Sequence, residues 1–202
     1  MMKIRDILIF ALMGVLFAAC SDVDQDTLED QQEDIVDFLT TDHDPLLISE
    51  SEVAESLDND PEFYTTTGTT AYRYIVDYYN PDRATRTEVK SGDTLWLTYW
   101  CYDFSSYSTP SSSYLYFTND PSYKDALVEA GLNVEYWSFE PSKVVLGQGD
   151  ILNAIETSLV GCREGDFVEI YLTYNMAYGS VWIGVSSLES PIAFFCTIDS
   201  IE

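Results

Sequence analysis

Basic residues are scarce in this chain of 202 residues. Nine lysines and arginines stand against 35 acidic residues, which gives a formal net charge of -26 at pH 7. A protein that binds nucleic acid needs cations that neutralise phosphates, so this balance excludes nucleic acid as a partner. It also disfavours adhesion to anionic lipid surfaces. The composition favours a soluble protein that works outside the cytoplasm or is displayed on a surface.

Histidine and cysteine are nearly absent as well. His43 is the only histidine, which excludes a metal site built from several histidines and disfavours a Ser-His-Asp hydrolase. The four cysteines include no CxxC pair. Cys101, Cys162 and Cys196 lie in strand-like or turn segments, and we interpret them as small core or turn residues. We therefore expect no metal and no cofactor.

Long hydrophobic runs are missing apart from one near the start. Lys3 and Arg5 precede an apolar run at residues 7–19, which is too short to span a bilayer comfortably. The run ends in LFAAC, which resembles a bacterial lipobox with Cys20 as the lipidated first residue of the mature protein. An ordinary secretion signal is the alternative. The following CSDVDQD resembles the acidic surface-export tether of Bacteroidetes lipoproteins. The sequence thus predicts a signal peptide at 1–19 and a lipid anchor in the outer membrane, facing the periplasm or the cell surface.

The segment 20–67 is polar and acidic, and we predict a tether with short helices there. Residues 27–41 have an amphipathic helical pattern with Thr27 as the expected N-cap, and 48–57 suggest a second short helix. The acids of 22–33 also have the spacing of a calcium-binding EF-hand loop. Thr27 stands where that loop needs glycine, which favours the tether.

Strand patterns dominate the segment 68–202, which we predict to be the folded domain. The clearest strand is 94–104, where residues at odd positions face one side and those at even positions face the other. Similar alternation marks 167–174 and 191–202, with buried rows of aliphatic and aromatic residues. This pattern predicts an antiparallel sheet.

Helical patterns are few in this domain. Residues 147–159 predict a turn and a helix with Asp150 as N-cap and Ile155 on the buried face. Residues 121–131 predict a short helical insertion that starts at a proline and closes at a glycine. Together the elements predict an α+β fold with a single helix on one face of the sheet.

The order of these elements and their residues resembles the FK506-binding (FKBP) family of peptidyl-prolyl cis-trans isomerases over roughly residues 70–202. VKSGDTLWLTYWCYDF (89–104) is similar to the family's Gly-Asp turn and the strand that follows it. A second match covers residues 144–179, which begin with VVLGQGD and end with NMAYG. This run resembles, without a gap, the family's order of a Leu-Gly, an aliphatic pair, a helix, a strand and an Ala-Tyr-Gly. SPIAFFCTIDSIE (190–202) resembles the closing strand. The resemblance implies an FKBP-like sheet curled around one helix, with an N-terminal helical appendage.

The resemblance also implies a pocket that takes the proline of a peptide. It assigns catalytic positions to Tyr99 and Tyr178, with the Tyr178 hydroxyl as the expected donor to a peptide carbonyl. A further pocket position falls on Ser142 or Phe139. The substrate-binding walls implied by the resemblance are Phe117, Ile151, Leu152, Ile155, Val185 and Phe194.

Several positions depart from the family pattern. Ile155 stands where the family's helix carries an indole, and Thr118 stands where the family has an aspartate. Ser186 to Leu188 replace an Ile-Pro-Pro segment, and 119–140 is an insertion expected to cover or reshape the pocket rim.

Two functions follow from these observations. The resemblance implies an extracytoplasmic lipoprotein that binds proline-containing or unfolded polypeptide and catalyses X-Pro cis-trans isomerisation. It would touch the membrane only through its lipid anchor. The departures favour an alternative, a catalytically inactive FKBP-like domain that is a binding or structural subunit of a cell-surface complex.

Overall fold

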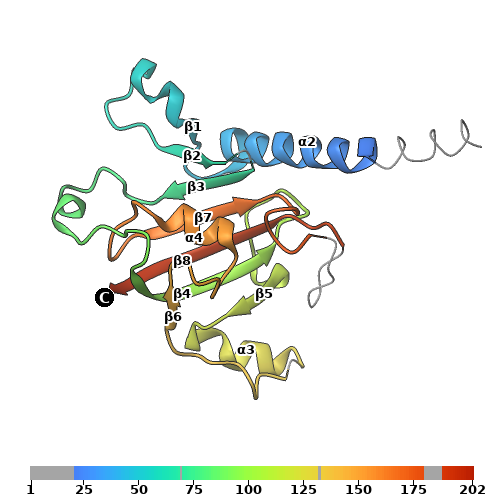
Figure 1. The fold of residues 1–202 in the computed structure, drawn as a ribbon. Coiled ribbons are helices and arrows are strands. Elements are labelled where there is room, and N and C mark those ends of the chain that lie inside the picture. Colours follow the sequence, from blue (N-terminus) through green and yellow to red (C-terminus); the bar gives the residue numbers. More distant parts are fainter. Residues whose placement is uncertain (1–20, 69, 132, 180–187) are drawn as a thin grey trace, which may run out of the picture.

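A single eight-stranded sheet organises the molecule in the computed structural model, which describes residues 21–68, 70–131, 133–179 and 188–202 (Figure 1). The strand order is β1-β2-β3-β7-β8-β4-β5, and β6 also pairs with β4. Only the β1–β2 pair is parallel among these pairings. The strands are β1 (Ile48–Ser49), β2 (Phe63–Thr67), β3 (Ala71–Ile75), β4 (Thr94–Asp103), β5 (Leu115–Thr118), β6 (Ser142–Val145), β7 (Phe167–Leu172) and β8 (Ile192–Ile201).

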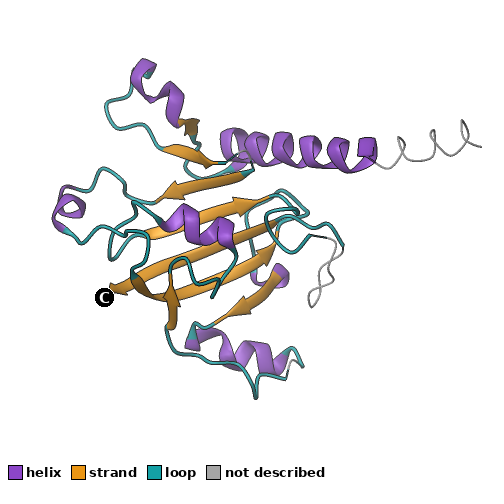
Figure 2. Cartoon of the chain, viewed as in Figure 1, coloured by secondary structure: helices purple, strands orange, loops and turns teal. Residues whose placement is uncertain are grey.

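Helices are short except at the N-terminal end, where α2 projects beyond the sheet (Figure 2). None of the helices in the described part of the chain is long and apolar enough to cross a membrane. The predicted α+β class is confirmed, including the N-terminal helical appendage. The helices are α2 (Ser21–Asp37), a π-helical turn (Phe38–Asp42), α3 (Lys124–Glu129), α4 (Asn153–Leu159) and 3-10 turns at Glu50–Glu55, Pro81–Thr85, Ser112–Tyr114 and Pro121–Tyr123.

The inner face of the sheet forms the first core, packed against α4. Alternation along β4 turns Leu95 and Leu97 inward, and both are fully buried. Ile155 and Leu159 of α4 pack onto this layer because they lie four residues apart on one side of the helix. The inward rows predicted for the three main strands are confirmed. On β7 and β8 they consist of Val168, Ile170, Leu172, Ile192, Phe194, Cys196 and Ile198.

The outer face forms a second core under the N-terminal segment. Phe38 packs its ring 5.1 Å from that of Phe104 and 5.7 Å from that of Tyr171. Ile35 and Leu39 are fully buried beside it. The central strands therefore carry apolar side chains on both faces, and the N-terminal segment is an integral layer of the fold.

The segment 20–67 differs from its prediction in three details. β2 pairs with β3, and its run of threonines suits a strand because β-branched residues pack well on a pleated surface. The expected helix at 48–57 is instead the short strand β1 and one 3-10 turn. Thr27 does not begin a helix, because α2 is already helical from Ser21, and the EF-hand-like stretch is helical with it.

His43 fastens the N-terminal segment to the sheet. Its Nε2 lies 2.9 Å from the Glu169 carboxylate on β7, and its Nδ1 bonds the Pro45 carbonyl. Both partners are acceptors, so both bonds form only when the imidazole carries two N–H groups and is cationic. Burial opposes that charge, but the two bonds and the charges of Glu169 and Asp44 outweigh it and raise the pKa of His43 above its ordinary 6.5.

This contact predicts a pH-dependent stability. Because the folded-state pKa of His43 is raised, its contribution is complete below about pH 6.5 and is lost as the pH rises through the folded-state pKa. The free energy of unfolding of the wild type should exceed that of His43→Gln by more at pH 5.5 than at pH 8.5. The groups that face His43 are Glu169, Asp44, Tyr74 and Tyr171.

Urea denaturation of both proteins at the two pH values measures this difference. Introducing Glu169→Gln into both proteins should flatten it, because the carboxylate partner is then gone. An equal difference at both pH values would show that the imidazole stays neutral.

Candidate ligand-binding pocket

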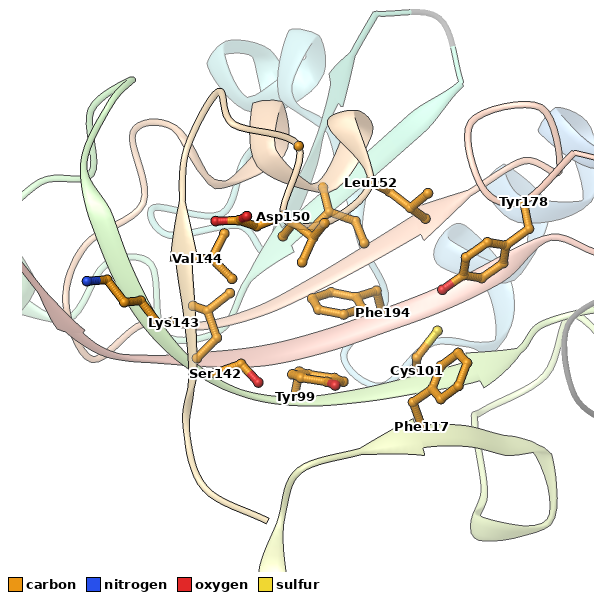
Figure 3. Close-up of a pocket in the computed structure, with 14 residues that line it drawn as sticks. Tyr99, Cys101, Phe117, Ser142, Lys143, Val144, Asp150, Leu152, Tyr178 and Phe194 are labelled. Carbon is orange, nitrogen blue, oxygen red and sulfur yellow. The ribbon is translucent and has the colours of Figure 1, made fainter. Parts of the chain in front are cut away.

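A cavity of about 600 Å³ lies on the inner face of the sheet beside α4 (Figure 3). Its walls are mostly aromatic and aliphatic. Its few polar groups are the hydroxyls of Tyr99 and Tyr178, the Cys101 thiol, and side chains from β6 and the turn before α4. This composition is typical of a site that takes an apolar group of a ligand and orients it with a few polar contacts. The cavity is lined by Leu97, Tyr99, Cys101, Phe117, Ser142, Lys143, Val144, Gly149, Asp150, Ile151, Leu152, Ile155, Tyr178 and Phe194.

Two stacked aromatic rings form one wall of the cavity. Tyr99 on β4 and Phe194 on β8 have ring centroids 5.5 Å apart and an interplanar angle of 19°. They face the same side because β4 and β8 are antiparallel neighbours and each residue lies in the inward row of its strand. Phe117 on β5 adds a third ring, with about 36% of its surface exposed.

The structure brings together seven of the residues that the sequence assigned to the pocket. They come from three strands, two turns and one helix, separated by up to 95 positions in the chain, and all of them line this cavity. Val185 and Cys20 lie outside the described residues. The seven are Tyr99, Phe117, Ile151, Leu152, Ile155, Tyr178 and Phe194.

The turn before α4 is held by a buried glutamate. Glu156 accepts hydrogen bonds from the backbone N–H groups of Gly147 and Gly149, at 2.9 and 3.1 Å. Both glycines have positive φ angles, which other residues rarely adopt. This turn places Ile151 and Leu152 at the cavity. Sequence reasoning missed Glu156, although an acid on the otherwise apolar side of a helix was a usable signal.

Asp150 does not cap α4 as predicted. Its carboxylate accepts a hydrogen bond from Val145 N–H at 2.9 Å, which closes the turn against the end of β6. The helix begins only at Asn153, with Leu152 at the N-cap position and no side-chain cap. The glycine-rich turn therefore uses Asp150 before the helix starts.

Tyr99 is fixed at both its backbone and its hydroxyl. Its N–H donates to Asn119 Oδ1 at 2.7 Å, and its carbonyl accepts from the Thr118 hydroxyl at 2.8 Å. Burial raises the pKa of Tyr99, and a hydrogen bond with Ser142 lowers it in part. The ring therefore has little freedom to leave the wall.

Tyr178 and Cys101 meet inside the cavity. Figure 3 shows the Tyr178 hydroxyl directed toward the Cys101 sulfur. Burial raises the pKa of the Cys101 thiol to about 12, and a hydrogen bond with Tyr178 lowers it in part. Cys101 is thus a neutral thiol at pH 7. The prediction that it is a plain core residue was incomplete, since its place in the inward row two positions after Tyr99 also puts it at the cavity.

The insertion 119–140 does not cover the cavity. None of its described residues lines the walls, so the expectation that it covers the pocket is wrong for that part of the chain. The reason is Asn119, whose Nδ2 donates to the carbonyls of Leu97 at 2.7 Å and Glu140 at 3.0 Å and so ties both ends of the insertion to β4. Ser142 takes the remaining pocket position, while Phe139 stacks on Trp137 outside the cavity.

Replacing Asn119 by alanine should destabilise the fold. The change leaves the Tyr99 N–H and the Leu97 carbonyl without their partner in a buried place, which costs about 2–4 kcal/mol in free energy of unfolding. Urea denaturation measures this loss in free energy of unfolding. Asn133→Ala is the matched control, because Asn133 makes one local bond at an exposed turn of the same insertion and should change stability by less than ~1 kcal/mol. Equal effects of the two changes would contradict the anchoring role.

Comparison with known proteins finds a likeness among solved structures but none among family models or curated sequences. No protein-family model matches this chain, and no curated protein sequence matches it. Among solved structures, the N-terminal domain of FKBP42 from Arabidopsis thaliana matches with a TM-score of 0.47 and 10% sequence identity. The match covers 73% of this chain and 95% of that chain. At this identity the likeness concerns the fold alone.

Proposed function

We propose that this chain is an extracytoplasmic lipoprotein whose pocket binds proline-containing or unfolded polypeptide and catalyses X-Pro cis-trans isomerisation. One observation carries the proposal: seven residues assigned to a proline pocket from the sequence line one apolar cavity, with the Tyr178 hydroxyl inside it. The partner is a polypeptide segment with an X-Pro bond.

The chemistry of this reaction suits such a cavity. Rotation about the peptide bond must overcome a barrier of roughly 18–20 kcal/mol, and the uncatalysed reaction takes ~10–100 s. No nucleophile and no metal is needed. The twisted amide has lost resonance and much of its charge separation, so an apolar, water-poor site disfavours the planar form relative to the twisted one.

Different residues of the pocket would bind the proline ring and the neighbouring peptide carbonyl. The stacked rings of Tyr99 and Phe194 can grip the proline ring, with Ile155 as the apolar base behind it. The Tyr178 hydroxyl can donate to a neighbouring peptide carbonyl once it exchanges its bond with Cys101. Binding the twisted amide more tightly than the planar one is what accelerates the reaction.

A second candidate function is binding without catalysis, as a subunit of a cell-surface complex. It is favoured by the internal bonds of both pocket tyrosines, Tyr99 with Ser142 and Tyr178 with Cys101. A ligand must break the latter bond before it can use the Tyr178 hydroxyl. The aliphatic Ile155 also offers no donor at the base of the cavity.

Removing the Tyr178 hydroxyl separates the two candidates. If it donates to the peptide in the transition state, Tyr178→Phe should lower kcat/KM roughly 2- to 12-fold, since one neutral hydrogen bond contributes about 0.5–1.5 kcal/mol. Tyr178→Ala should lower it further because the wall is lost too. A protease-coupled assay with an X-Pro peptide measures the rate.

Tyr136→Phe is the control for this assay, because Tyr136 is strongly exposed and does not line the cavity. It should leave the rate unchanged. A wild-type rate equal to that of buffer would rule out the isomerase. Retained affinity for the peptide in that case would support the second candidate.

The lipid anchor is a separate part of the proposal. It rests on the apolar run that ends in LFAAC, and it makes Cys20 the residue that holds the protein at the outer membrane. Cys20→Ala should abolish incorporation of labelled palmitate in a bacterial host and release the protein from the membrane fraction. Cys101→Ala is the matched control and should keep the label. Full labelling of Cys20→Ala would refute the anchor.

A further inference from the structure

Gln31 of α2 forms a bridge between two distant parts of the chain. Its side-chain Nε2 donates to the Glu189 carbonyl at 2.8 Å, and its Oε1 accepts from the Tyr174 N–H at 2.9 Å. Only about 6% of the residue is exposed. A buried amide with both of its ends bonded to backbone is costly to disturb, because two hydrogen bonds are lost together.

The bridge lies where the two central strands separate. Leu172 on β7 and Ile192 on β8 form the last paired positions of the two strands. Beyond that pair the chain leaves β7 at Tyr174 and returns toward β8 at Glu189. The Gln31 side-chain amide forms hydrogen bonds with both departing segments and so takes the place of the next backbone hydrogen bonds between the two strands. Glu189 has a φ angle of 60°, an unfavourable value for a residue with a side chain, so it needs such a restraint.

Tyr174, the residue held by Gln31, also fixes the turn that carries Tyr178. The Tyr174 carbonyl accepts hydrogen bonds from Ala177 N–H at 3.2 Å and Gly179 N–H at 2.8 Å, the two neighbours of Tyr178. Gln31 holds the N–H side of Tyr174, and the carbonyl of the same residue holds the turn. A short bonded path therefore connects α2 to the pocket hydroxyl.

We propose that Gln31 is a positioning residue that makes the ligand-binding geometry of Tyr178 depend on docking of the N-terminal helix. The inference rests on the proposed function for its effect on peptide binding. Gln31 does not line the cavity, so it acts only through the turn. Ile35, one turn further along α2, anchors the same helix in the outer core and keeps Gln31 in register.

Gln31→Met tests the physical link in the full chain, because methionine keeps the length of the side chain and removes both hydrogen bonds. Amide hydrogen exchange of Ala177 and Gly179 should accelerate about tenfold or more, while exchange of Ile170 and Cys196 in the central strands stays unchanged. Gln32→Ala, at the neighbouring position of the helix, should alter neither set. Unchanged exchange of Gly179 in Gln31→Met would overturn the proposal.

Peptide affinity tests the functional consequence by a double-mutant cycle. Gln31→Met should weaken binding of an X-Pro peptide about fivefold or more, and should have no further effect when added to Tyr178→Ala. Equal weakening in both backgrounds would show that Gln31 acts through general stability, which overturns the positioning role. If the wild type binds no X-Pro peptide, the proposed function fails, and the exchange measurement still decides whether Gln31 holds the turn.

Discussion

Both faces of the central strands are apolar, so the sheet is stable only when both are covered. The inner face is covered by a helix that is too short for the task. α4 has seven residues and is about 10 Å long, whereas β4 and β8 have ten residues each and extend roughly 33 Å. The uncovered part of the inner face is the cavity. Its walls are the inward rows of the strands, which is why a pocket and a core can be built from the same alternation.

The outer face is covered differently, by the N-terminal segment. Phe38 and its buried neighbours pack on the aromatic side of the sheet, and His43 adds a charged bond to Glu169. Gln31 then reaches the edge where β7 and β8 part. A segment that begins next to the proposed lipid attachment point therefore also stabilises the sheet and holds the turn that carries Tyr178.

The polar groups near the cavity are used mainly to hold the backbone. Asn119 fixes Tyr99 and both ends of the insertion, and Glu156 fixes the glycine turn before α4. Buried side chains that bond to backbone are costly to remove, so the walls are pre-organised. This leaves few groups free to contact a ligand. The proposed ligand, a proline ring with a neighbouring carbonyl, would be held by its apolar surface and one directed hydrogen bond.

By itself the sequence determined the alternation of the strands and the α+β class, because inward and outward positions follow directly from a period of two. The set of residues at the cavity was implied by the resemblance of the motifs to the FKBP family. Tyr99, Phe194 and Ile155 could be assigned to one site before the structure was known. Other features were decided only by tertiary structure. Asp150 bonds Val145 instead of capping a helix, the insertion is tied away from the pocket by Asn119, and Gln31 reaches residues more than 140 positions away. Each of these depends on which polar partner lies nearest in space, and a one-dimensional pattern of apolar and polar residues does not contain that information.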